Sequence, residues 1–250
     1  MRLFGTLVTA ILSLGCSHAL EVKNLDVYSA PVRLYAGDER FSVAVLPYSG
    51  SPAGLFYFNS LVERIHNSPA VSELRTDYLP GKGGRFEPVL ILSISPQVKY
   101  RSSGWNFLIN WPGFLIFTPA WNGYVYHADI LTQVVVHDGS GKPMSEDAIP
   151  ISYSIRQAEM DRTIFTGLTW LEVSALAFGG GIYNAFTFDD DIVGSLQVHV
   201  KDNYVNYVAN QVGPKLIAAA DAARPAPPPA DAVPVPPEAA PPAETPTPSP

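Results

Sequence analysis

The chain has 250 residues, of which 47% are hydrophobic and 16% charged, and its formal net charge is −7 at pH 7. An acidic chain without a basic cluster is unsuited to binding nucleic acid or to electrostatic docking on anionic lipid. Cys16 is the single cysteine. This excludes an intramolecular disulfide, so the compartment has to be inferred from the amino terminus.

The amino terminus has the layout of an export signal. Arg2 precedes the uncharged apolar run LFGTLVTAILSLG, residues 3–15, which is too short for an ordinary membrane-spanning helix. The run ends in Leu-Ser-Leu-Gly-Cys16, which resembles the lipobox of bacterial lipoproteins, where a peptidase cuts before an acylated cysteine. We therefore predict a signal peptide at 1–15 and a lipid anchor on Cys16. Ser17 follows, and the absence of Asp there resembles lipoproteins sorted to the outer membrane.

A second processing site leaves an alternative open. Ser17-His18-Ala19 fits a small-x-small cleavage site. Cleavage after Ala19 would release a soluble secreted protein with a structural or host-directed binding role. The two hypotheses differ in whether Cys16 survives in the mature chain. We expect residues 16–40 to lead into one globular domain at 41–220, a length that supports a real core.

The domain is expected to open with a strand and a helix. Residues 41–48, FSVAVLPY, are apolar and β-branched and predict a buried strand. Ser51 and Pro52 suit the N-cap and the first position of a helix that runs to about Asn67. A short strand is expected at 71–75. The apolar face of the helix is predicted from spacings of three and four, at Leu55, Phe58, Val62 and Ile65.

Three more strands are expected in the middle of the chain. One covers residues 88–95 and extends to about Tyr100. Residues 124–137 alternate in polarity, and after the turn HDGSGKP the chain is expected to return as a hairpin partner at 149–161.

Two helices are expected to complete the domain. The first covers 166–178, and the second opens at Asp189-Asp190-Asp191 and ends at Gly213-Pro214. Its apolar face is predicted at Val193, Leu196, Val200, Tyr204, Tyr207 and Val212. The order β-α-β-β-β-α-α predicts an α/β fold, or an α+β variant, with a single mixed sheet packed by helices.

Two stretches resemble a known family. FSVAVLPYSGSPAGLFYFNSLVERIHNSP is similar to the opening strand and first helix of the TolB amino-terminal domain and related envelope lipoproteins, among them the curli secretion lipoprotein. YVYHADILTQVVVHDGSGK resembles the family's long strand with its Asp-x-x-x-Gly turn. The resemblance covers roughly 41–100 and 124–161, and the chain departs from it at 105–121 and in its tail. It implies a non-enzymatic adaptor at the envelope and carries over no functional residue.

The segment 105–121, WNFLINWPGFLIFTPAW, contains three tryptophans, three phenylalanines and no charge. Trp111-Pro112-Gly113-Phe114 fits a type II turn, which predicts a small hairpin with arms at 105–110 and 114–118, apolar on both faces. Such a hairpin must be covered by its own domain, a membrane surface, a partner or a second copy. We predict membrane or partner contact by its aromatic anchors Trp105, Trp111, Phe114, Phe117 and Trp121.

The carboxy-terminal segment 221–250 is predicted to be a disordered tail. Half of the 24 prolines fall within 225–250, and proline has no backbone N–H to donate to a helix or a ladder. The tail is expected to act as an extended spacer, or else as a ligand for a proline-recognising partner or a strut through the cell wall.

No catalytic, metal or cofactor site is predicted. His127 and Asp129 share a strand face, but no third ligand occurs at metal spacing. The GSGKP motif at 139–143 joins two strands and lacks the remaining residues of a phosphate loop. The expected partners are a membrane, reached through the acyl anchor, and envelope proteins, with a homo-oligomer possible and no nucleic acid. The expected role is a non-catalytic scaffold or accessory subunit in secretion, polysaccharide export or cell-wall synthesis.

Overall fold

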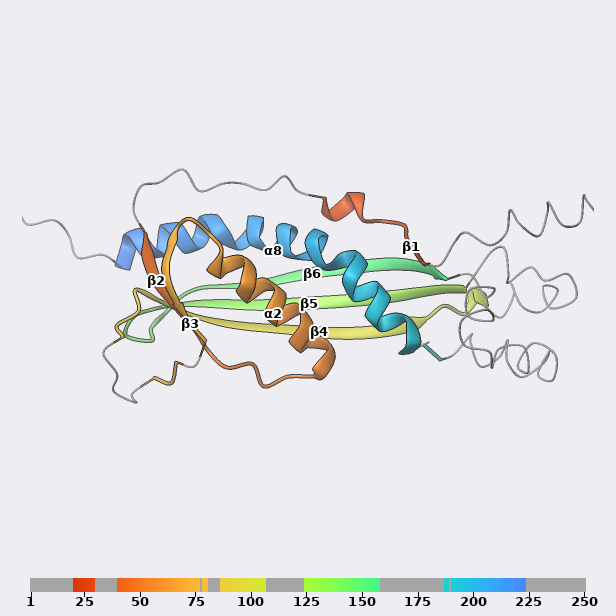
Figure 1. The fold of residues 1–250 in the computed structure, drawn as a ribbon, viewed down its shortest axis with the longest axis horizontal. Helices are drawn as coiled ribbons and strands as arrows, with labels where there is room; N and C mark the ends of the chain where they lie inside the picture. Colours follow the sequence, from red (N-terminus) through yellow and green to blue (C-terminus); the bar gives the residue numbers. More distant parts are fainter. Residues whose placement is uncertain are drawn as a thin grey trace, which may run out of the picture.

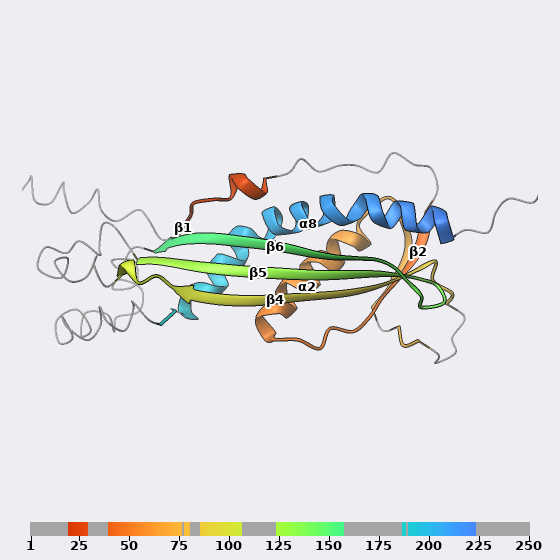
Figure 2. The same ribbon diagram turned by 180° about the vertical axis from the view of Figure 1, so that it is seen from behind.

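A computed structural model describes residues 20–29, 40–76, 78–80, 86–106, 124–157, 187–188 and 190–223. Within these residues, six strands form one mixed sheet in the order β1-β6-β5-β4-β2-β3. Helices α2 and α8 pack on one face of the sheet (Figure 1), and no described helix covers the other face (Figure 2). A single mixed sheet packed by helices is the fold that the sequence predicts.

The β2-α2-β3 unit forms one side of the sheet. β2 (Phe41–Val45) pairs in parallel with both β3 (Val71–Arg75) and β4, and α2 (Pro52–His66) connects β2 to β3. The predicted start of α2 is confirmed, because the Ser51 side chain accepts a hydrogen bond from Gly54 N at 3.2 Å.

The predicted apolar face of α2 is partly wrong. Phe58 and Ile65 are buried, but Leu55 is 44% exposed, whereas Tyr57 and Leu61 are buried. The helix packs against α8 as well as the sheet, and the rings of Tyr57 and Tyr204 meet edge to face at 4.9 Å. The second packing partner rotates the buried face of α2 toward α8.

Three long strands form an antiparallel meander. They are β4 (Leu90–Ser102), β5 (Tyr124–Asp138) and β6 (Pro143–Gln157). The predicted start of β6 at 149 is wrong, because pairing resumes at Pro143. The turn is tight: Asp138 N donates to Lys142 O at 2.9 Å, and Gly141 has a φ of 89°, a conformation that favours glycine.

A short strand in the predicted leader joins the sheet at the free edge of β6. β1 (Leu20–Val22) pairs antiparallel with residues 155–157, and the 3-10 turn η1 (Asp26–Tyr28) follows it. Asn24 extends the pairing with its side chain. Its Nδ2 donates to Ser152 O at 2.5 Å, and Ser154 N donates to its Oδ1 at 2.8 Å.

Asn24→Ala should therefore loosen the amino-terminal segment. The change removes two hydrogen bonds and leaves polar groups on the β6 edge unpaired, at a cost of about 1–2 kcal/mol. Hydrogen exchange should be faster at Lys23, whose N donates to Ser154 O at 2.9 Å, and unchanged in the β4–β5 ladder. Equal acceleration in both places would contradict a local role for Asn24.

The last helix is longer than predicted. A 3-10 turn, η2 (Asp190–Ile192), leads into α8 (Val193–Ala223), which continues through Pro214 rather than ending there. Leu216, Ala219 and Ala220 are buried beyond the proline. Their packing outweighs the hydrogen bond that proline cannot donate. α8 thus extends to Ala223, into the segment predicted as tail.

The core lies between the sheet and the two helices. Its largest fully buried side chains include Tyr57, Tyr126, Tyr153 and Tyr204. The Tyr204 hydroxyl bonds to Thr132 Oγ1 at 2.8 Å, and Tyr153 Oη donates to Asn203 Oδ1 at 2.8 Å. The predicted signal peptide and the rest of residues 1–19, the predicted helix at 166–178 and the proline-rich segment after 223 lie outside the described residues.

Candidate functional site

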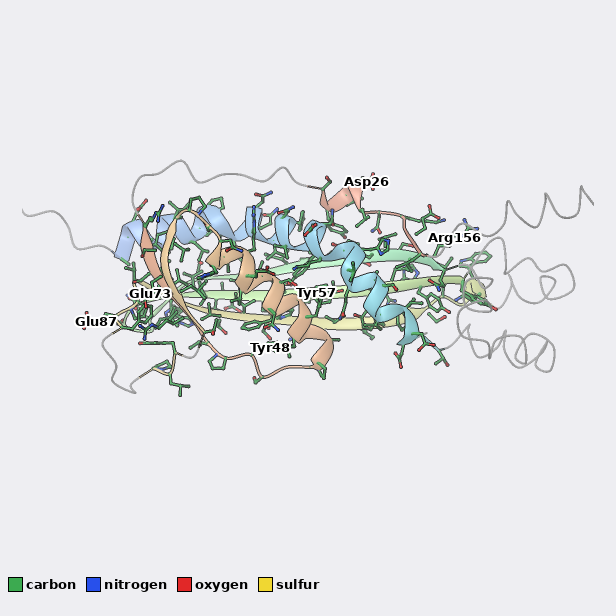
Figure 3. All side chains as sticks on the ribbon, in the orientation of Figure 1. Asp26, Tyr48, Tyr57, Glu73, Glu87 and Arg156 are labelled. Carbon is green, nitrogen blue, oxygen red and sulfur yellow. The ribbon has the colours of Figure 1, made fainter. Side chains whose placement is uncertain are left out.

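Several elements of the sheet end at the same place. Leu20 pairs with Gln157, Gln157 pairs with Tyr124, and Ser102 pairs with Tyr126. The first residue of β1, the last of β6, the first of β5 and the last of β4 therefore share one end of the sheet, which we call the amino-terminal pole (Figures 1 and 2). Arg156 marks this pole, whereas Glu73 and Glu87 lie at the opposite end (Figure 3).

The amino-terminal pole is built from aromatic side chains. The rings of Tyr100 and Phe188 stack with centroids 4.7 Å apart, and Phe188 meets Tyr126 edge to face at 5.2 Å. Tyr124 and Tyr126 are buried. Phe188 belongs to the short described stretch before α8, so this cluster ties that stretch to β4 and β5.

Asn106 closes the β4–β5 ladder at this pole. Its Nδ2 donates to Ser102 Oγ at 3.0 Å and to Val125 O at 2.9 Å, and Val125 N donates to its Oδ1 at 2.8 Å. The residue is fully buried. The Asn106 side-chain amide takes the place of a backbone amide in the ladder. No local sequence pattern marks such a residue, and the sequence analysis did not predict it.

Asn106 positions the one predicted contact residue that the structure describes. Trp105 precedes it and is 69% exposed. The predicted β-arm at 105–110 is wrong for its first two residues, because Asn106 N donates to Ser103 O at 3.0 Å in a turn. Contact by Trp105 stays a prediction. The other predicted site residues lie outside the described residues: Cys16, Trp111, Phe114, Phe117 and Trp121.

The open face of the sheet carries a polar network near the pole. Arg101 Nη2 lies 2.6 Å from Asp129 Oδ2, and Ser152 Oγ donates to Asp129 Oδ1 at 2.7 Å. Partial burial raises the pKa of Asp129. Hydrogen bonds from Ser152 and Arg101, with the positive charge of Arg101, outweigh it and hold that pKa below its usual value. The network joins all three strands of the meander.

The GSGKP motif, considered above for phosphate binding, is part of a hydrogen-bonded turn. Asp138 Oδ1 accepts hydrogen bonds from Ser140 N, Ser140 Oγ and Lys142 N at 3.0, 2.6 and 2.9 Å, so the GSGKP backbone is held by its own turn. Across the described ranges, no three His, Cys, Asp or Glu side chains come together as metal ligands. Neither α2 nor α8 is both long and apolar enough to cross a membrane.

The described residues define an α/β protein with one mixed sheet, helices on a single face and an aromatic pole. No family model matches the chain, and no curated protein matches its sequence. Among solved structures, the chain is similar to a minor lipoprotein from Acinetobacter baumannii, with 9% identity and a TM-score of 0.29. The alignment covers 66% of this chain and 94% of that chain. A TM-score of this size does not establish a shared fold.

Proposed function

We propose that this chain is a bacterial envelope lipoprotein, acylated on Cys16 and held on the periplasmic side of the outer membrane. It acts by binding rather than by catalysis, as a scaffold or accessory subunit of an envelope assembly. Secretion, polysaccharide export and cell-wall synthesis are the candidate settings. The resemblance of residues 41–100 and 124–161 to the TolB amino-terminal domain supports an adaptor role, and we include kinship with that domain in the proposal.

The geometry of the amino-terminal pole carries this proposal. Cys16 precedes Leu20 by four residues, so a fully extended chain places it within about 14 Å of the start of β1. The exposed Trp105 belongs to the same pole, because it follows the end of β4 at Ser102 and precedes Asn106, which bonds to Val125 at the start of β5. An anchor on Cys16 would bring that tryptophan close to the bilayer surface, where its amphipathic ring is favoured.

A second contact near the anchor has an energetic reason. One acyl chain binds a membrane marginally, and stable retention takes a second signal. We propose that Trp105, together with Trp111, Phe114, Phe117 and Trp121, supplies that contact with the membrane or with an envelope partner. In this arrangement the body of the sheet extends away from the anchor.

The test is the intact mass of the mature protein from the membrane fraction, measured beside a Cys16→Ala variant. We expect a chain that starts at Cys16 and is heavier by a diacylglycerol and an acyl group. The variant should remain unprocessed or leave the membrane fraction. A wild-type chain that starts at Leu20 without lipid would overturn the anchor and favour the soluble secreted alternative.

A further inference from the structure

A groove lies between the two helices, away from the amino-terminal pole. Its volume is about 410 Å³, within the range of small-molecule sites. The end of α2, the turn that follows it and the second half of α8 form its walls, and the sheet forms its floor. Val71, Ala209 and Ile217 are half-buried apolar residues of its lining, and its base is formed by the buried side chains of Phe41, Leu61, Ile65, Ile94, Val134 and Leu216.

The glycine at position 213 of α8 leaves part of this groove open. Gly213 and Pro214 both line it, and a Cβ added to Gly213 would meet no atom within 4 Å. A larger side chain at this position would therefore enter free space without a clash. A glycine inside a helix destabilises it by about 1 kcal/mol relative to alanine. Gly213 therefore leaves the groove open although it lowers the stability of α8.

Arg64 is the one charged side chain in the lining, and it has no ion pair among the described residues. Its neighbour Glu63 is engaged with Lys201 at 3.0 Å. A cation in the last turn of α2 complements the helix dipole, and Arg64 lies in that turn. The position of Arg64 against an apolar groove is thus suited to an anion that enters with an apolar body.

We propose that this groove binds a single-chain anionic amphiphile of the fatty-acid class. The acyl chain lies on the half-buried apolar side chains of the lining, Val71, Ala209 and Ile217, and the carboxylate pairs with Arg64. Asn67 and Asn206, which also line the groove, offer amide groups beside that head group. A guanidinium binds a carboxylate with two parallel hydrogen bonds, which explains a preference for a charged over a neutral head group.

The groove is separate from the proposed anchor. Val134 on its floor lies ten residues along β5 from Tyr124, about 30 Å at the rise of a strand. Ligand binding there does not depend on acylation of Cys16, so the inference stands or fails independently of the proposed function.

The test is a titration of the full chain, carrying Cys16→Ser, with laurate and with the neutral alcohol dodecanol below their aggregation limits. Calorimetry should give a dissociation constant for laurate on the order of 10–100 µM. Dodecanol should bind about five- to tenfold more weakly, and Arg64→Gln should weaken laurate binding by a similar factor while leaving dodecanol unchanged.

Gly213→Leu should abolish laurate binding by filling the groove. Gly194→Leu is the matched control, because Gly194 is on the same helix, its Cβ would also meet nothing, and it lies outside the groove. Circular dichroism should show both variants folded. Laurate binding that survives Gly213→Leu, or equal binding of laurate and dodecanol, overturns the proposal. So does a Gly213→Leu chain that loses self-association while laurate has no effect, since the groove would then bind a second copy.

Discussion

Raising the pH above about 10 should destabilise this domain steeply. Desolvation by burial raises the pKa of Tyr57, Tyr153 and Tyr204, and all three side chains are fully buried. In the unfolded chain, tyrosine ionises near pH 10. Below that pH the three phenols are protonated in both states and contribute no pH dependence.

Above pH 10 the unfolded chain releases these protons and the folded chain keeps them. Each tyrosine then lowers the free energy of unfolding by about 1.4 kcal/mol per pH unit, so the three together lower it by about 4 kcal/mol per unit. Urea unfolding at successive pH values, read by circular dichroism, measures this slope, and tyrosinate absorbance should rise together with unfolding.

Tyr57→Phe is the variant that isolates one contribution. The Tyr57 hydroxyl is buried and forms no hydrogen bond of regular geometry, so its removal should leave the stability at neutral pH unchanged or slightly higher. The slope above pH 10 should become shallower by about 1.4 kcal/mol per pH unit. Tyrosinate absorbance that rises before the fold is lost would contradict the expected order of events.

Leu196→Ala should lower the free energy of unfolding by about 3 kcal/mol. Leu196 is fully buried where the first turns of α8 pack on the sheet, and truncating it leaves a cavity as well as losing apolar burial. Val198 lies two residues further along the same helix and is 73% exposed.

Val198→Ala is therefore the control for Leu196→Ala. It changes helix propensity in the favourable direction and should alter the free energy of unfolding by less than about 0.5 kcal/mol. Chemical denaturation of the three chains measures both effects. Similar losses in the two variants would contradict a core position for Leu196 and a surface position for Val198.

Local signals in the sequence were sufficient for most of the elements. Ser51 and Pro52 fixed the start of α2, and alternation identified the β5 strand, because caps and periodicity are set by neighbours along the chain. Errors arose where tertiary contacts decide. Pro214 predicts a helix end on local grounds, yet α8 continues because Leu216 and Ala220 have a surface to pack against.

The sites were less accessible to prediction than the fold. Cys16 and Trp105 were predicted as contact residues from a motif and from composition, and both roles stay predictions. The place of Leu20 at the amino-terminal pole depends on its pairing with Gln157, which no local pattern encodes. The groove was not predicted, since its walls join Arg64 on α2 to Gly213 on α8, far apart in the sequence.

The pairing of β1 with β6 also sets an order of events during biosynthesis. β1 is the first strand of the sheet to leave the ribosome and β6 is the last, with about 130 residues between Val22 and its partner Ile155. At roughly 5–20 residues per second, synthesis of the intervening chain takes on the order of ten seconds. Leu20–Val22 has no partner strand during that interval. The edge strand β1 can therefore join the sheet only after β6 has been made.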